Sequence, residues 1–176
     1  SETRSTSAPN TTIPAHRLQA SGIETNIDAV FSPKGTGAIL ADLPDNATSG
    51  GNKRGSNAVD LQISRSANTQ VAAGANSTIA GGMNNTASGS QSVVGGGKTN
   101  TASATFSTVA GGDLGVASGN GSVVGGGASN TASGFAATVS GGSGNRAIGS
   151  QATVSGGISN TASGNYAIVS GGYENM

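Results

Sequence analysis

Hydrophobic and small residues recur through the last two thirds of the chain at a fixed spacing of fifteen residues. Each repeat starts at a β-branched residue, defined here as position 1, which is followed by one small residue and two glycines. Self-similarity at a fixed period predicts a repeat architecture. The position 1 residues are Ile79, Val94, Val109, Val124, Val139, Val154 and Val169.

Two short runs in each repeat have strand character, at positions 14 to 2 and at positions 7 to 10, and glycines bound both of them. Two adjacent glycines would cost a helix roughly 2 kcal/mol per repeat, and no 3.6-residue hydrophobic stripe compensates for them. The pattern therefore predicts an all-β fold, a parallel β-roll or β-solenoid of 15-residue coils. With strands about 4.8 Å apart, seven coils would form a rod segment of roughly 30 to 35 Å.

The residues expected to hold the coils together are β-branched or small. Side chains alternate along a strand, so positions 14 and 1 would point to one face and position 15 to the other. Both faces carry compact residues, so we expect burial against the strand's own coil on one face and against a partner chain on the other. Structural roles are predicted for Val94, Val109, Val124, Val139, Val154, Gly141, Gly142, Gly156 and Gly157.

The pattern divides the chain into three regions: a flexible N-terminal segment (1–22), a small β-containing region (23–63) and a β-roll repeat array (64–176) truncated in its last copy. The first fifteen residues are rich in Ser, Thr, Pro and Asn and have no periodicity. Turn-forming residues interrupt the second region at 33–37 and 44–46. Twelve of the sixteen acidic and basic residues precede Ile79, so charge lies mainly outside the array.

Composition narrows the classes of function. Leu, Ile, Val and Phe total only 29 of 176 residues, but zero net charge and an unbroken period argue against a disordered chain. Zero net charge also argues against a nucleic-acid partner. Cysteine is absent, so no disulfide staples the fold. We find no signal peptide and no apolar run that could span a bilayer, so membrane insertion is not expected. The missing initiator Met and the stop within a repeat indicate a fragment of a longer protein.

Several motifs with apparent chemistry have structural explanations. The GGGKT run at 95–99 is similar to a phosphate-binding loop, but Ser92 stands where that motif requires glycine. A calcium-binding roll needs an Asp in each repeat, and the array has only Asp113. His16 is expected to be a solvated surface residue. Glycoside hydrolysis needs two carboxylates at a defined separation; the array offers only Asp113 and Glu174, and the other acidic residues precede it. We therefore predict no enzymatic activity, no metal site and no cofactor.

The repeated NTASG and VSGG phrases resemble the head repeats of trimeric autotransporter adhesins, over residues 70–176. The resemblance implies a left-handed parallel β-roll in which three chains are intertwined as a homotrimer.

A second resemblance covers the region before the array. The strings NIDAVFSPKGTGAILADLPDN (26–46) and SGGNKRGSNAVDLQISRSANTQVAAG (49–74) are similar to segments of tail-fibre proteins of tailed bacteriophages. That resemblance implies a homotrimeric component of the virion tail fibre, in contact with other tail proteins and adsorbing to a bacterial surface.

Three functions follow from these patterns. The first is a structural and host-adsorption segment of a phage tail fibre, because it accounts for both resemblances. The second is the head domain of a bacterial trimeric autotransporter adhesin, which accounts for the array alone. The third is an ice-binding solenoid, since Thr recurs at position 8, although Val116 and Arg146 interrupt that column.

A receptor, expected to be a carbohydrate of the bacterial surface, would contact the variable turns at positions 5, 6, 12 and 13, because loops on a rigid scaffold carry binding residues. An exposed aromatic ring beside polar groups is typical of a sugar site, although such a ring can also fill a gap between chains. The candidates are Asn165, Tyr166, Thr105, Phe106 and Tyr173. The Asn residues at position 7 are read as turn residues that satisfy their own backbone, in preference to a ligand ladder.

Overall fold

The chain divides into two units, Ser1–Ser32 and Pro33–Met176, of which the computed structural model describes residues 2–5, 15–18, 33 and 35–176. In the first unit, β1 (Glu2–Ser5) pairs antiparallel with β2 (Ala15–Leu18). His16 lies in β2. The rest of the segment predicted to be flexible (1–22), and most of the 23–63 region before residue 35, lie outside the described residues.

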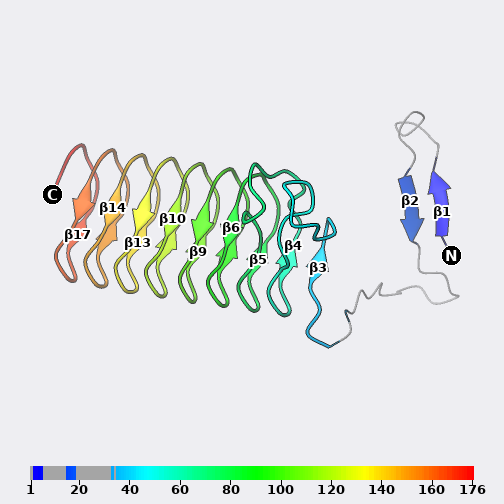
Figure 1. The fold of residues 1–176 in the computed structure, drawn as a ribbon. Coiled ribbons are helices and arrows are strands. Elements are labelled where there is room, and N and C mark those ends of the chain that lie inside the picture. The colour runs from blue at the N-terminus through cyan, green and yellow to red at the C-terminus, as the bar shows by residue number, and fades with distance from the viewer. Residues whose placement is uncertain (1, 6–14, 19–32, 34) are drawn as a thin grey trace, which may run out of the picture. The chain divides into compact units, whose positions relative to one another are not determined.

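The second unit is a parallel β-solenoid whose coils stack side by side (Figure 1). This arrangement confirms the predicted all-β fold, and the described part of the chain contains no helix. Its larger sheet runs in the order β17-β15-β13-β11-β9-β7-β5-β4-β3. These strands are β3 (Ile39–Leu40), β4 (Val59–Asp60), β5 (Thr78–Ile79), β7 (Val93–Val94), β9 (Thr108–Val109), β11 (Val123–Val124), β13 (Thr138–Val139), β15 (Thr153–Val154) and β17 (Ile168–Val169).

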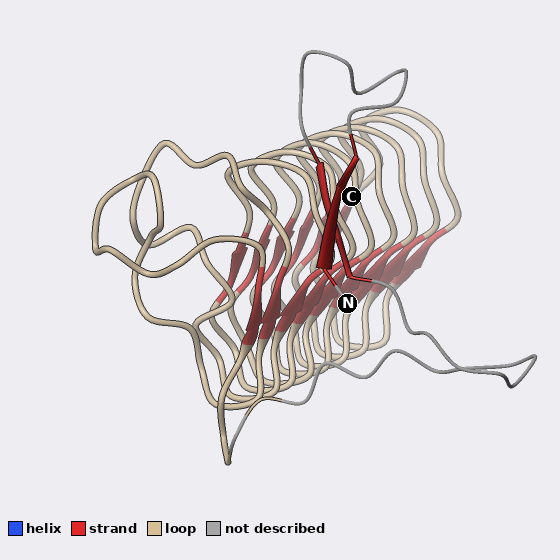
Figure 2. Cartoon of the chain, turned by 90° about the vertical axis from the view of Figure 1, so that its right-hand side faces the viewer, coloured by secondary structure: helices blue, strands red, loops and turns tan. Residues whose placement is uncertain are grey.

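A second parallel sheet runs along the same coils, and Figure 2 shows both rows of short strands from the end of the solenoid. It contains β6 (Thr86–Ala87), β8 (Thr101–Ala102), β10 (Val116–Ala117), β12 (Thr131–Ala132), β14 (Arg146–Ala147) and β16 (Thr161–Ala162). The two sheets occupy positions 15 to 1 and 8 to 9, inside the two runs that the sequence predicts. A third row of isolated parallel bridges joins position 5 of successive coils, from Met83 to Tyr173.

In-register pairing places equivalent residues of successive repeats next to one another. Val124 pairs with Val109 in the preceding coil and with Val139 in the following coil. Every position therefore forms a column of equivalent residues along the rod. Positions 1 and 9 build the core: Val124 and Ala132 are fully buried, as are their counterparts in the other complete coils. Position 14 is also buried from Ser92 to Ala152.

The outward face of the larger sheet is covered less than its inward face. Position 15 is half-buried from Thr78 to Thr153, and Ile168 is 72% exposed at the end of the array. Alternation of inward position 1 with outward position 15 follows the prediction. Burial of the outward face against a partner chain stays a prediction.

Strands β3 and β4 extend the larger sheet to the N-terminal side of residue 64. At β4 the inward residue is Asp60, which is fully buried and continues the column formed by Ile79 and the valines of position 1. Its Oδ2 accepts a hydrogen bond from Arg54 Nε at 2.7 Å and lies 3.8 Å from Arg65 Nη2. A buried carboxylate is tolerated only when it is paired in this way. The two Arg side chains therefore allow a charged residue to continue a valine column.

The two glycines of each repeat have different roles. A Cβ at Gly142 would overlap the carbonyl oxygen of Gly157 in the next coil, and Gly142 also has φ +86°. Gly157 has the same conflict with Gly172. A Cβ at Gly141 or Gly156 would meet nothing within 4 Å. Close packing therefore restricts position 4, whereas Gly141 and Gly156 at position 3 have room for a Cβ.

Candidate functional site

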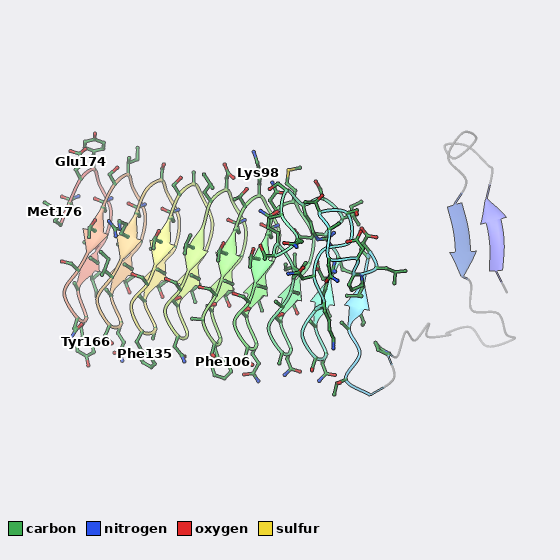
Figure 3. All side chains as sticks on the ribbon, viewed as in Figure 1. Lys98, Phe106, Phe135, Tyr166, Glu174 and Met176 are labelled. Atoms are coloured by element: carbon green, nitrogen blue, oxygen red, sulfur yellow. The ribbon has the colours of Figure 1, made fainter. Side chains whose placement is uncertain are left out.

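The turns of the coils form two edges that run along the solenoid. One edge contains the residues at positions 5 and 6, and the other contains those at positions 12 and 13; they are called the 5–6 edge and the 12–13 edge below. Figure 3 shows Lys98 and Glu174 on the first and Phe106, Phe135 and Tyr166 on the second. Both edges are made of the residues that vary between repeats.

Three aromatic side chains lie on the 12–13 edge (Figure 3). Phe106 and Phe135 are each 57% exposed and Tyr166 is 69% exposed. Two of them, Phe106 and Tyr166, are candidates from the sequence. The structure adds Phe135 to their row. Phe135 stands at position 12 and the other two at position 13, so alignment of the repeats alone places it in a different column.

The structure separates Tyr173 from this row. Tyr173 occupies position 5, where it bridges to Ile158 of the preceding coil, and it is 65% exposed. It therefore belongs to the 5–6 edge. The sequence candidates divide into one group around Tyr166 and Phe106 and a separate residue on the other edge.

The two polar candidates take part in contacts between turns. The carbonyl oxygen of Thr105 accepts a hydrogen bond from the backbone N–H of Gly121 at 3.0 Å. The side-chain Oδ1 of Asn165 accepts one from the backbone N–H of Ser150 at 3.0 Å. Each contact joins position 12 to an adjacent coil and holds that turn in place.

Position 13 has a left-handed backbone in every complete coil. Phe106 has φ 59° and Tyr166 has φ 61°, and Ala136 at the same position has φ 51°. Bulky residues rarely adopt this conformation. Position 6 has the same conformation, for example at Asn84 and Leu114. These two positions, rather than the Asn column at position 7, carry the left-handed turns.

The position 7 Asn column is an internal ladder. Asn145 is fully buried, and its Nδ2 donates to Gly141 O in its own coil and to Gly157 O in the next, both at 2.9 Å. Its Oδ1 accepts the backbone N–H of Asn160 at 2.9 Å. The side chains therefore satisfy their own turns, as predicted, and in addition bind neighbouring coils to each other.

The resemblance of residues 95–99 to a phosphate-binding loop does not extend to their backbone. The N–H of Lys98 donates to Gly112 O at 2.9 Å and that of Thr99 donates to Met83 O at 3.0 Å. Both N–H groups are thus used between coils, whereas a phosphate loop points such groups at its ligand.

Within residues 35–176 and the two N-terminal strands, no group of three or more His, Cys, Asp or Glu side chains is placed to hold a metal ion. None of the described residues forms a helix long and apolar enough to cross a membrane.

The position 8 column, which is relevant to ice binding, faces outward and is half-buried. Arg146 interrupts it as an exposed residue in β14. A bulky charged side chain in the middle of the column prevents a flat threonine surface.

Charged groups gather in the loops between β3 and β5. Asp45 accepts hydrogen bonds from the Ser49 hydroxyl and from the backbone N–H groups of Ala47 and Gly50. These bonds, that of Ser49 most strongly, lower the pKa of Asp45. Asp45 is thus an ionised turn residue and not a proton donor.

A cavity of about 250 Å³ lies in the same region and is lined by Leu40, among other residues.

A short segment of the chain is similar to a known family of repeats. Residues 77–89 match the family described as ubiquitous surface protein adhesin repeat. This segment contains β5, the following glycine turn and β6. No curated protein and no solved structure matches the chain. The matched segment recurs along the array with the same register, so the solenoid is built of adhesin-like repeats.

Proposed function

We propose that this chain is an adhesin-like rod that binds a bacterial surface through the 12–13 edge. The observation that carries the proposal is the row of exposed aromatic rings on turns of a rigid solenoid. Such rings are available for contact, and their turns vary without disturbing the buried columns at positions 1 and 9. The match to an adhesin repeat supports the same role. The proposal assigns the chain no catalytic step.

The setting that we propose is the virion tail fibre of a bacteriophage, with other tail proteins as partners. It rests on the resemblance of residues 26–46 and 49–74 to tail-fibre segments. A cell-bound trimeric adhesin head is the second candidate. The match of residues 77–89 to an adhesin repeat supports it as well as it supports the tail-fibre setting. The genes on either side of this one distinguish the two settings, since a fibre gene lies among other tail genes.

The rod is proposed to be a homotrimer. The half-buried β-branched row at position 15 is a continuous outward face, and contact with partner chains would bury it. Sedimentation of the purified chain should therefore give about three times the monomer mass. Thr138→Asp should reduce the trimer to monomers, because the new charge would be desolvated between chains. A folded monomer of the unchanged chain at micromolar concentration would contradict this arrangement.

Tyr166→Ala tests the binding role. We expect adsorption of the chain to host cells to weaken about tenfold, which corresponds to the loss of one exposed aromatic contact. Ala136 already occupies the equivalent left-handed position, so the backbone of the variant should be retained. Adsorption is measured with fluorescently labelled chain on whole bacteria.

The matched control is Met83→Ala, at a 43% exposed residue on the 5–6 edge. It should adsorb as the unchanged chain does. If Tyr166→Ala instead lowers the melting temperature sharply, Tyr166 packs between chains. If neither property changes, the array is a spacer and the binding role is wrong.

A further inference from the structure

The aromatic residues of the 12–13 edge occur on alternate coils. With the coil that starts at Ile79 as the first, Phe106, Phe135 and Tyr166 belong to the second, fourth and sixth coils. Neighbouring coils are about 4.8 Å apart, so the rings recur roughly every 9.6 Å along the rod. The edge therefore carries aromatic platforms on alternate coils, with Phe135 one residue earlier in its turn than Phe106 and Tyr166.

Backbone hydrogen bonds fix this spacing. The N–H of Phe106 donates to Ser90 O at 3.0 Å, and the N–H of Tyr166 donates to Ser150 O at 2.8 Å. The carbonyl oxygen of Phe135 accepts from Gln151 N at 2.7 Å. Each turn is thus bonded to a turn of an adjacent coil. The platforms cannot move independently along the axis.

The edge between the platforms is polar and uncharged. No acidic or basic residue occurs at positions 12 and 13 of any complete coil. The intervening third and fifth coils supply amide and hydroxyl groups, on Asn120, Ser150 and Gln151. The 5–6 edge is different, because it carries Lys98 and Asp113. Only the 12–13 edge alternates apolar rings with neutral hydrogen-bonding groups.

We propose that the 12–13 edge binds an extended, uncharged polysaccharide that lies along the rod, with one sugar of each successive disaccharide stacked on Phe106, Phe135 or Tyr166. This inference rests on the proposed surface-binding function and names its ligand. The apolar face of a sugar ring stacks on an aromatic ring, while its hydroxyl groups bond to the amides between the platforms. Two sugars of an extended chain span a length close to the platform spacing.

The spacing argues against a peptide strand as the occupant. In a β-strand, side chains on one face recur about every 6.8 Å, which does not match a period of roughly 9.6 Å. A polyproline II peptide has a turn of about 9.3 Å, but such peptides dock in aromatic-lined grooves. The 12–13 edge consists of outward turns. A polysaccharide fits both its period and its shape.

The test exchanges two residues between neighbouring coils. Phe135→Ser combined with Ser150→Phe moves the middle ring by one coil and leaves the composition unchanged. Affinity is measured for the whole chain against oligosaccharides of increasing length, prepared from the neutral surface polysaccharide of a bacterium to which the chain adsorbs. For the unchanged chain, affinity should rise until the oligosaccharide spans all three rings. The exchange should weaken binding of the longest one at least about tenfold.

The control exchange is Ser143→Ile with Ile158→Ser on the 5–6 edge, which should leave affinity unchanged. Periodate oxidation of the cells should abolish adsorption, and protease treatment should not. If the Phe135 and Ser150 exchange variant binds with the same affinity as the unchanged chain, the proposed polysaccharide row is wrong and the surface-binding role stands. The same conclusion follows if protease treatment of the cells, and not periodate, removes adsorption. A sharp fall in its melting temperature also overturns the row, because the rings would then pack between chains. Failure of the unchanged chain to adsorb to any bacterium overturns both proposals.

Discussion

Val139→Asp should lower the free energy of unfolding by about 4 kcal/mol per chain, because the new carboxyl would be buried without a partner. Val139 is fully buried in the middle of the position 1 column, between Val124 and Val154 of the adjacent coils. Neither neighbour can donate a hydrogen bond to a carboxylate. For a chain of this length the loss corresponds to a fall of roughly 10 °C in melting temperature. Thermal unfolding followed by circular dichroism measures it.

The loss of stability caused by Val139→Asp should depend on pH in a defined direction. Burial raises the pKa of the new carboxyl in the folded state above its unfolded value of about 3.9. The carboxyl is therefore neutral in both states at low pH, and the destabilisation grows as the pH rises through the unfolded pKa towards the folded pKa. The variant should be closest to the unchanged chain at about pH 3.

Ser140→Asp is the control for this substitution. Ser140 is exposed and follows Val139 directly, so the same charge enters the same part of the coil without burial. It should change stability by no more than about 0.5 kcal/mol. Equal stability of the two variants would mean that position 1 does not form a closed core.

Gly142→Ala should be the second strongly destabilising change, with a loss of about 3 kcal/mol or more per chain. An L residue in the left-handed region costs about 1 to 2 kcal/mol, and here the Cβ would also overlap the carbonyl oxygen of Gly157. That oxygen belongs to the backbone of the next coil, so it cannot move away without disturbing the ladder. Urea unfolding of the purified variant gives the change in free energy.

The neighbouring glycine provides a matched comparison. Gly141→Ala places the same methyl group where nothing lies within 4 Å, and φ of Gly141 is outside the left-handed region. Its stability should stay within about 1 kcal/mol of the unchanged chain. If both alanine variants lose the same stability, overlap of the Cβ with the next coil does not distinguish position 4 from position 3.

The period of the sequence was sufficient to predict the strands and their stacking. Position 1, position 9 and the glycine pair repeat without an insertion, and parallel in-register stacking turns such a period into buried columns. The position 5 bridges could not be predicted, because that position holds residues as different as Lys98 and Ile158 and the bridges involve only backbone groups.

Strands β3 and β4 could not be predicted from the fifteen-residue period, for a different reason. Ile39, Val59 and Thr78 occupy equivalent places in the larger sheet, yet they are not fifteen residues apart. The inward residue of β4 is Asp60, and a hydrophobic pattern does not reveal a charged core residue whose partner, Arg54, comes from a neighbouring loop.

The candidate site was predicted in part. Variation in the turns identified the edges, and the aromatic residues identified the places of interest. Whether two turn residues share an edge depends on the path of the coil, which sequence spacing alone does not specify. Tyr173 and Tyr166 are close in sequence but lie on different edges, whereas Phe135 and Tyr166 are further apart and lie on the same edge.

The uninterrupted register also makes the coil the unit in which this rod can change its length. Removal of fifteen residues would join strands whose buried columns still coincide, whereas removal of fourteen would exchange inward and outward side chains in every later coil. A deletion or duplication of fifteen codons would therefore remove or add one whole coil and preserve the reading frame. Related solenoids would thus differ in length by steps of about 4.8 Å, with both turn edges still pointing in their original directions.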